Sequence, residues 1–313
     1  MSDKPNAVEV EHLAKRFGDF TAVDDVTFHI PAGEIFGLLG PNGAGKTTII
    51  RMLCGILLPT SGQAWVMGFD ITRQPEEVKR RIGYMSQKFS LYSDLTVIEN
   101  LDFYAHIYEL PAAKRKQRMS ELIEMAGLRG REKELTANLS GAWRQRLALA
   151  CAIVHEPPML FLDEPTAGVN PVSRREFWNM IYDLAARDVS VLATTHYMDE
   201  AEYCNMIGMM YNSRLIALDE PDALKVSIPG TLLEIECDAP DRAEAAARRF
   251  PGVVNAALHG ILLHVTVEDA ALAAPLQQAL EQERVVIQRI EAVLPSLEDT
   301  FVSLVEAQDR AHQ

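Results

Sequence analysis

The chain has 313 residues, 48% of them hydrophobic, and a formal net charge of −14 at pH 7. This length is enough to bury one large core and a second, smaller one. The acidic balance argues against a nucleic-acid backbone as partner, because such partners require a basic face. No run of about eighteen apolar residues occurs, so we expect no transmembrane helix, and the N-terminal residues lack the apolar stretch of a secretory signal.

The cysteines are scattered without paired spacing and lie among apolar neighbours. This pattern predicts buried free thiols and a reducing compartment rather than disulfides or a metal site. The four residues are Cys54, Cys151, Cys204 and Cys237. Together with the missing secretory signal, they predict a cytoplasmic protein.

Residues 6 to about 225 alternate short apolar strands with amphipathic helices, which is typical of an α/β fold with a largely parallel sheet. The stretch 35–39 is predicted as a buried strand that leads into a glycine-rich loop. Two more buried strands are predicted over 159–162 and 189–193. Between them, residues 171–187 are predicted as a crossover helix that opens with a proline.

The pattern changes twice along the chain. From about residue 96 to 156 it is nearly all helical, which predicts a helical subdomain inserted into the α/β core. Pro229-Gly230 marks a boundary, so we predict one domain over residues 1–226 and another over 231–313. The second has the predicted order β-α-β-β-α-β and a final helix, which is consistent with a small ferredoxin-like α+β domain.

The glycine-rich loop between the strand 35–39 and the following helix is predicted to bind the phosphates of ATP. Its glycines allow the backbone to turn sharply, so that successive amides point at phosphate oxygens. Lys46 supplies a charge to the β and γ phosphates, and the Thr47 hydroxyl is a ligand for Mg²⁺. The predicted nucleotide-binding residues here are Gly40, Pro41, Asn42, Gly43, Ala44, Gly45, Lys46, Thr47 and Thr48.

Two carboxylates follow the buried strand 159–162, at the edge where open α/β sheets place their ligands. Asp163 is predicted to hold Mg²⁺, mostly through water, and Glu164 to act as general base on the attacking water. Alone, the pair would equally fit a solvated acidic turn. The phosphate loop upstream favours the catalytic interpretation.

Several further motifs occur in a fixed order along the chain. Phe17 follows Lys15-Arg16, Gln87 ends Tyr84-Met85-Ser86-Gln87, and His196 follows Thr194-Thr195. The stretch 139–145, Leu-Ser-Gly-Ala-Trp-Arg-Gln, is similar to a signature motif. With these motifs, residues 6–225 resemble the nucleotide-binding subunit of an ABC transporter.

This resemblance implies a role for each motif. Phe17 would stack on adenine, Gln87 would sense Mg²⁺, and His196 would donate to the γ-phosphate. The remaining residues would contact nucleotide on an opposite subunit, with Ser140 as N-cap of a helix that points its amides and positive dipole at the γ-phosphate. These residues are Ser140, Gly141, Ala142 and Asn170. Taken as single residues, Phe17 would better fit a core or hairpin aromatic, and His196 would fit a core or surface position.

Two positions depart from the family pattern. Ala142 stands where the signature has a second glycine, and Asn170 stands where the dimer loop usually has aspartate. Alanine keeps the backbone amide, and asparagine keeps the size but loses the charge. We expect ATP binding to be retained and the ATPase to be active. The sequence does not set its rate, because Ala142 and Asn170 both affect contacts made during hydrolysis.

The C-terminal part resembles the accessory domain of drug- and antibiotic-export ATPases, through Pro295-Ser296-Leu297-Glu298-Asp299-Thr300-Phe301. These residue types alone also fit an amphipathic helix that opens with proline. The resemblance implies a motor for a separate transmembrane permease, paired with a second ATP-binding subunit as a homodimer, at the inner face of the cell membrane.

Two other functions remain open from the sequence. One is an ABC-type ATPase that acts on ribosomes or DNA, although such proteins usually carry two cassettes or a long coiled-coil insertion. The other is a regulatory ATP-binding module with little hydrolysis, which Ala142 and Asn170 favour. The transported substrate is not readable from the sequence.

Overall fold

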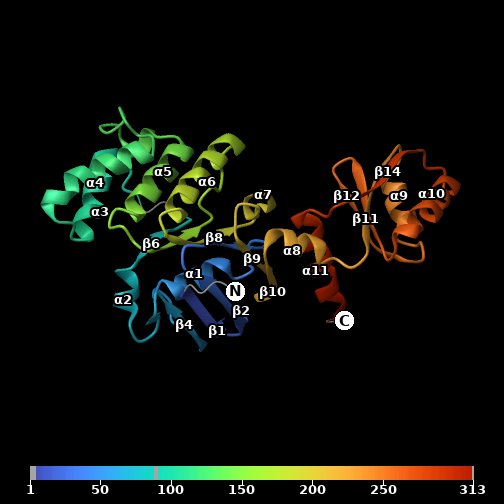
Figure 1. The fold of residues 1–313 in the computed structure, drawn as a ribbon, viewed down its shortest axis with the longest axis horizontal. Coiled ribbons are helices and arrows are strands. Elements are labelled where there is room, and N and C mark those ends of the chain that lie inside the picture. Colours follow the sequence, from blue (N-terminus) through green and yellow to red (C-terminus); the bar gives the residue numbers. More distant parts are fainter. Residues whose placement is uncertain (1–4, 88–90, 312–313) are drawn as a thin grey trace. The chain divides into compact units, whose positions relative to one another are not determined.

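A computed structural model describes residues 5–87 and 91–311. These residues form two compact units, the first ending at Glu220 and the second beginning at Pro221 (Figure 1). The outer ends of the predicted domains, residues 1 and 313, lie outside the described residues. Within the described part of the chain, no helix has the length and apolar character needed to cross a membrane.

Two sheets build the first unit. One has the strand order β2-β1-β4-β5 and is antiparallel, and the other has the order β10-β9-β3-β8-β7-β6 and is parallel except for β10. The strands are β1 (Asn6–Phe17), β2 (Phe20–Pro31), β3 (Ile35–Leu39), β4 (Ser61–Val66), β5 (Phe69–Asp70), β6 (Ile82–Met85), β7 (Met159–Asp163), β8 (Ser190–Thr195), β9 (Met206–Tyr211) and β10 (Arg214–Asp219).

The helices of this unit cover both faces of the parallel sheet. Helix α1 packs against β7 on one side and against β2 and β4 of the antiparallel sheet on the other. In Figure 1, α5 and α6 lie on the opposite face. The helices are α1 (Lys46–Leu53), α2 (Pro75–Lys79), α3 (Val97–Ile107), α4 (Ala112–Met125), α5 (Gly141–Ala152), α6 (Pro171–Ala185) and α7 (Met198–Ala201), with a 3-10 turn at Thr136–Asn138.

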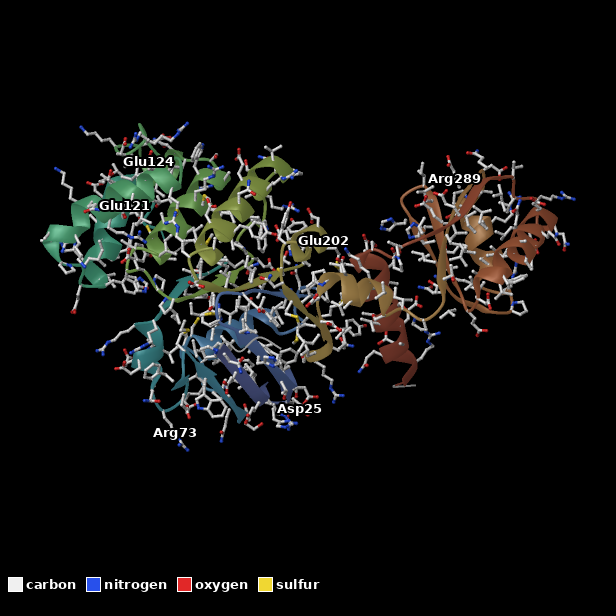
Figure 2. All side chains as sticks on the ribbon, viewed as in Figure 1. Asp25, Arg73, Glu121, Glu124, Glu202 and Arg289 are labelled. Atoms are coloured by element: carbon white, nitrogen blue, oxygen red, sulfur yellow. The ribbon has the colours of Figure 1, made fainter. Side chains whose placement is uncertain are left out.

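The parallel strands are the apolar runs of the sequence because they are covered on both faces. Every residue of β3, β7 and β8 is buried. Phe28 of β2 stacks on Phe36 of β3 with ring centroids 5.0 Å apart, which joins the two sheets through one core. Charged side chains such as Asp25, Arg73 and Glu121 are exposed and point outward (Figure 2). The predicted α/β fold is confirmed.

The helical subdomain consists of α3, α4 and α5, which pack on one another. Helix α3 begins with a capping box, in which Thr96 accepts from the backbone of Glu99 and the Glu99 side chain accepts from the backbone of Thr96. Such a box satisfies two amides that the first turn leaves unpaired. The helices lie within the predicted range 96–156.

The second unit has a four-stranded antiparallel sheet of order β12-β13-β11-β14. Helices α9 and α10 supply the other half of its core. The predicted order β-α-β-β-α-β with a closing helix is what the structure has. The elements are α8 (Pro221–Val226), β11 (Thr231–Cys237), α9 (Pro240–Ala247), β12 (Val253–His259), β13 (Leu262–Val267), a 3-10 turn at Ala270–Leu272, α10 (Ala273–Gln282), β14 (Ile287–Val293) and α11 (Leu297–Ala311).

The boundary between the units differs from the predicted one by the length of α8. The sequence placed residues 221–226 in the first domain, whereas in the structure this helix belongs to the second unit. The physical reason is that α8 packs on α11, which lies far along the chain. A local pattern of turn residues carries no signal of that contact.

All four cysteines are free and buried, as the sequence predicts. Burial raises the pKa of the thiols of Cys54, Cys151 and Cys204, so these groups stay protonated and unreactive at neutral pH.

Candidate nucleotide site

The phosphate loop lies between β3 and α1, at the carboxyl end of the central strand. Gly43 and Gly45 have φ of 84° and 105°, a region that favours glycine. A Cβ on Gly45 would also stand 2.4 Å from the carbonyl oxygen of Ala22. Position 45 therefore requires glycine for two reasons, and the loop brings its amides to the N-terminus of α1, where anions bind.

Lys46, the first residue of α1, is nearly fully buried at 4% exposure. Its Nζ donates to the carbonyl oxygens of Gly40 at 2.6 Å and Pro41 at 3.0 Å, and lies 3.8 Å from Oε1 of Glu164. Burial lowers the pKa of Lys46, although the carboxylates of Glu164 and Asp163 oppose this shift. The ammonium is thus held inside the loop, where a phosphate would stand.

Asp163, the last residue of β7, is bound by two hydroxyls. Thr47 donates to its Oδ1 at 2.9 Å, and Thr194 of β8 donates to the same oxygen at 2.8 Å. Burial raises the pKa of Asp163, while these hydrogen bonds partly offset the shift. A hydroxyl beside a carboxylate is the oxygen donor set that suits Mg²⁺. The predicted ligands Thr47 and Asp163 therefore lie together and fit the ion.

Glu164 follows in the left-handed region of the backbone, with φ of 48°. Its N–H donates to the Thr194 hydroxyl at 2.9 Å, which holds the turn. Its Oε2 accepts from Nε2 of Gln87 at 2.9 Å, and its Oε1 lies 3.5 Å from Nδ1 of His196. The three predicted catalytic residues, Glu164, Gln87 and His196, therefore converge beside Lys46.

His196 lies directly after β8, and 32% of its side chain is exposed. Its Nδ1 is buried and has no hydrogen-bond partner among the described residues. The polar atom that faces this nitrogen is Oε1 of Glu164, 3.5 Å away. The imidazole is therefore held next to the catalytic carboxylate.

Phe17 is the last residue of β1, at the tip of the hairpin with β2. Its ring is 49% exposed, and Nζ of Lys15 lies 5.0 Å from the ring centroid. An exposed aromatic face beside a cation is available for stacking on a base. The structure thus leaves Phe17 free for the predicted contact with adenine, which stays a prediction.

The signature residues stand at the N-terminus of α5. Ser140 occupies the N-cap position as predicted, but its exposed hydroxyl makes no capping hydrogen bond. Gly141 and Ala142 form the first turn, and a Cβ on Gly141 would meet no atom within 4 Å. This helix end is open toward solvent within the single chain.

Asn170 acts locally as the N-cap of α6. Its Oδ1 accepts from the backbone N–H of Ser173 at 3.0 Å, and its Nδ2 donates to the Ser173 hydroxyl at 3.2 Å. The sequence interpretation gave Asn170 an intersubunit contact only and missed this role, although an asparagine directly before Pro171 is a typical N-cap signal. Its exposed side chain stays a predicted contact to a second subunit.

Thr194 is the functional residue that sequence reasoning missed. Its hydroxyl joins the carboxylate of Asp163 to the backbone of Glu164, and the residue is fully buried. A hydroxyl residue one position before the end of a buried strand was the available local signal. Pairing of Asp163 with Thr194 across β7 and β8 makes the contact.

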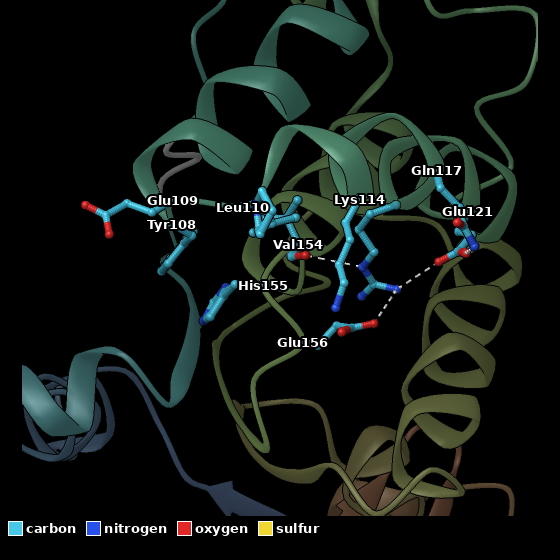
Figure 3. A pocket seen from close by; sticks show the side chains of 11 residues that line it. Tyr108, Glu109, Leu110, Lys114, Gln117, Glu121, Val154, His155 and Glu156 are labelled. Atoms are coloured by element: carbon cyan, nitrogen blue, oxygen red, sulfur yellow. Dashed lines mark hydrogen bonds and ion pairs between the residues drawn. The ribbon is translucent and has the colours of Figure 1, made fainter.

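A separate pocket lies at the other end of α5 (Figure 3). Tyr108 stacks on His155 there, with ring centroids 3.6 Å apart, and burial lowers the pKa of His155 to about 4. Arg118 donates to the carbonyl oxygens of Ile153 and Val154. None of the predicted nucleotide-site residues lines this pocket, so it is a distinct feature of the helical subdomain.

Comparison with known proteins assigns the chain. A family profile described as ABC transporter matches residues 23–167, and one described as the C-terminal domain of DrrA1-3-like ATP-binding proteins matches residues 220–305. The daunorubicin resistance ATP-binding protein DrrA2 of Streptomyces coeruleorubidus is 35% identical over 304 residues, which cover 95% of this chain and 94% of DrrA2. The chain belongs to the ABC transporter ATP-binding proteins.

Another relative of this ABC protein is longer. The probable multidrug ABC transporter ATP-binding protein YbhF of Escherichia coli (strain K12) is 50% identical over 218 residues, or 70% of this chain. The match spans only 38% of the length of YbhF. The ABC protein described here therefore corresponds to one part of that relative.

Solved structures confirm the fold of the ABC domain. The ATP-binding subunit of an ABC transporter superposes with a TM-score of 0.64 at 29% identity, covering 70% of this chain and 92% of that one. CbiO1 of Clostridium perfringens, part of the ABC transporter complex cbiONQ, gives a TM-score of 0.66 at 27% identity, covering 72% and 92%.

Proposed function

We propose that this ABC protein is the ATP-hydrolysing motor subunit of a membrane exporter. The observation that carries the proposal is the convergence of Glu164, Gln87 and His196 beside the buried Lys46. A general base, an amide and an imidazole around a phosphate-binding lysine are the groups that hydrolysis of a phosphoanhydride needs. The names of relatives, which include daunorubicin resistance and multidrug transport, support export as the process that is driven.

Each residue has a role in this proposal. Lys46 and the loop amides bind the phosphates, while Thr47, Gln87 and Asp163 hold Mg²⁺. When bound there, the ion would supply positive charge that offsets the charge of the phosphates. Glu164 takes up the proton of the attacking water at its carboxylate, and His196 donates a hydrogen bond to the γ-phosphate.

Each site is completed by a second copy of the chain. The N-terminus of α5, with Ser140, Gly141 and Ala142, has the amides and dipole that bind an anion, and the Ser140 side chain makes no capping hydrogen bond among the described residues. Asn170 is likewise exposed. We place these residues against the nucleotide held by the opposite subunit, so that ATP closes a head-to-tail dimer and hydrolysis reopens it.

The partner in this proposal is a transmembrane permease encoded separately, which holds the ATPase at the inner face of the cell membrane. Names of relatives such as the linearmycin resistance ATP-binding protein LnrL of Bacillus subtilis (strain 168), 31% identical over 303 residues, support this assignment to export. The transported molecule would be selected by the permease.

Turnover of Mg·ATP by purified protein tests the catalytic part of the proposal. Replacing Glu164 with glutamine should lower turnover by about 10²- to 10⁴-fold, because a positioned general base contributes that much. Glu202→Gln, an exposed glutamate in the same region (Figure 2), is the matched control and should keep the wild-type rate. Equal rates for wild type and Glu164→Gln would remove Glu164 from its role and favour a regulatory ATP-binding module.

Purification of the tagged protein from membranes tests the transport part. Recovery of a multispanning membrane protein in a fixed ratio, with ATPase activity raised by that partner, is the expected result. Recovery with ribosomes and without a membrane protein would contradict the transporter assignment.

A further inference from the structure

A buried carboxylate that the nucleotide site does not use lies on α7, four residues after His196. Glu200 is fully buried, with 0% exposure. Burying an ionised carboxylate costs free energy unless it is paired and hydrogen-bonded. The groups that contact the Glu200 carboxylate therefore indicate what stabilises an acid at this buried position.

Glu200 contacts three segments of the chain through its two oxygens. Its Oε1 accepts a hydrogen bond from the Thr166 hydroxyl and lies 3.3 Å from Nε of Arg174 on α6. Its Oε2 accepts from the Thr195 hydroxyl at 2.6 Å. Burial raises the pKa of Glu200, and these hydrogen bonds and the guanidinium of Arg174 oppose the shift.

The two threonines belong to the two segments that flank the catalytic carboxylate. Thr166 directly precedes the loop 167–170, two residues after Glu164, and its carbonyl oxygen accepts from the N–H of Val169. Thr195 ends β8 directly before His196, and its hydroxyl also accepts from the N–H of Tyr197 at 3.0 Å. The carboxylate of Glu200 thus binds the residue before the loop 167–170 and also Thr195, whose hydroxyl in turn binds the N–H of Tyr197.

The loop 167–170, which we call the dimer loop, is also held by helix α5. Gln145 of α5 is buried and donates from Nε2 to the carbonyl oxygen of Ala167 at 3.2 Å. A continuous path of contacts therefore runs from α5 through the loop 167–170 and Glu200 to the segment of His196. Packed hydrogen-bonded paths of this kind are able to carry energetic coupling, which only a coupling measurement demonstrates.

We propose that Glu200 is a positioning residue for ATP hydrolysis, which couples the dimer loop to His196. This inference rests on the proposed function. Contact of a second subunit with the loop 167–170 would shift Thr166, and Glu200 would pass that shift to Thr195 and thereby to the imidazole. Hydrolysis would then proceed only when the opposite subunit is in place.

The competing explanation is that Glu200 only neutralises the buried Arg174. Asp199 separates the two explanations, because it also pairs with Arg174, at 3.0 Å, but has no hydrogen bond to Thr166 or Thr195 among the described residues. Asp199→Asn is therefore the matched control for Glu200→Gln. It weakens the same guanidinium pair and leaves both threonine contacts in place.

The kinetic test compares kcat and KM for Mg·ATP in these variants. Glu200→Gln and Thr166→Val should each lower kcat by about 10-fold or more, the effect of losing a hydrogen bond to a charged group, with KM within about twofold. Asp199→Asn should keep both constants. A parallel loss in Asp199→Asn, or unchanged kcat in Glu200→Gln with a lower melting temperature, would assign Glu200 to stability alone.

A second readout is independent of hydrolysis. The measurement is the NMR imidazole resonance of His196 in the protein without nucleotide. The resonance is assigned by its loss in His196→Ala. Thr166→Val should shift this resonance in the wild-type background and leave it unmoved in the Glu200→Gln background. An equal shift in both backgrounds, or no shift in either, would overturn the coupling. Absence of turnover in wild type would instead count against the proposed function, and the resonance would still decide for or against Glu200.

Discussion

The two halves of the nucleotide site differ in how much of their chemistry one chain provides. On the phosphate side, Lys46 and Asp163 are buried and hydrogen-bonded to other residues of the same chain. On the signature side, Ser140 and Asn170 are exposed, and the only contacts of the Asn170 side chain described are to its own helix cap. The phosphate side is preorganised within the subunit, whereas the signature side is an exposed surface that we propose a second subunit covers.

This difference predicts which variants should change the affinity for ATP and which should change turnover. A preorganised pocket pays little ordering cost when its ligand arrives, so ATP affinity should depend on the phosphate side of a single chain. Turnover should depend on both sides, because groups that act only in the closed dimer contribute to the transition state. Variants on the phosphate side should therefore change the affinity for ATP, whereas variants on the signature side should change turnover alone.

Among the variants that separate the two sides, the largest expected effect is on binding. Lys46→Ala should weaken binding of a fluorescent ATP analogue by about 100-fold, because it removes a charge-assisted contact to the phosphates. Lys79→Ala, an exposed lysine of α2, is the control and should bind as wild type does. Unchanged affinity in Lys46→Ala would show that the loop amides alone provide the phosphate contact.

The next effect should appear in turnover alone. Ser140→Glu places a carboxylate where an opposite phosphate is expected, while a negative charge at the N-terminus of α5 is tolerated by the helix dipole. We expect turnover to fall by about 10-fold or more and the affinity of the single chain for the ATP analogue to stay within about twofold. A comparable loss of affinity would break the division between the two sides.

Whether the sequence predicts the role of a site residue depends on how far along the chain its contact partners lie. The loop 40–47, Asp163 and Glu164 form contiguous motifs, and their positions follow from the ends of buried strands. Thr194 and Glu200 act through partners that neighbouring strands and helices bring to them, so no local pattern assigns their roles. The same applies to α8, whose domain depends on a distant helix.

A smaller effect should come from restoring the usual dimer-loop charge. Asn170→Asp keeps the acceptor that caps α6 at the Ser173 N–H and adds a charge that favours the helix N-terminus, so stability should be retained. Turnover should rise by a few-fold, about the effect of one improved hydrogen bond across the subunit contact. Steady-state ATPase rates, with melting temperatures as the control, measure both.

The smallest effect concerns the ligand-free protein. Because burial raises the pKa of Asp163, the folded state disfavours its charged form. This residue contributes stability that is present below the ordinary aspartate pKa of 3.8 and is lost as pH rises through the higher folded value. Asp163→Asn should thus raise the melting temperature of the ligand-free protein at pH 7 and lessen the further stabilisation by Mg·ATP. A lower melting temperature without ligand would mean that the two hydroxyl contacts outweigh burial.

The packing of α8 on α11 has a consequence for the order in which the chain folds during synthesis. The first unit ends before α8, so it has all its strands as soon as Glu220 has left the ribosome. Helix α8 has to wait for α11, which emerges only after the whole sheet of the second unit. The ATPase unit should therefore be folded, with its phosphate loop closed, while the accessory unit is still assembling.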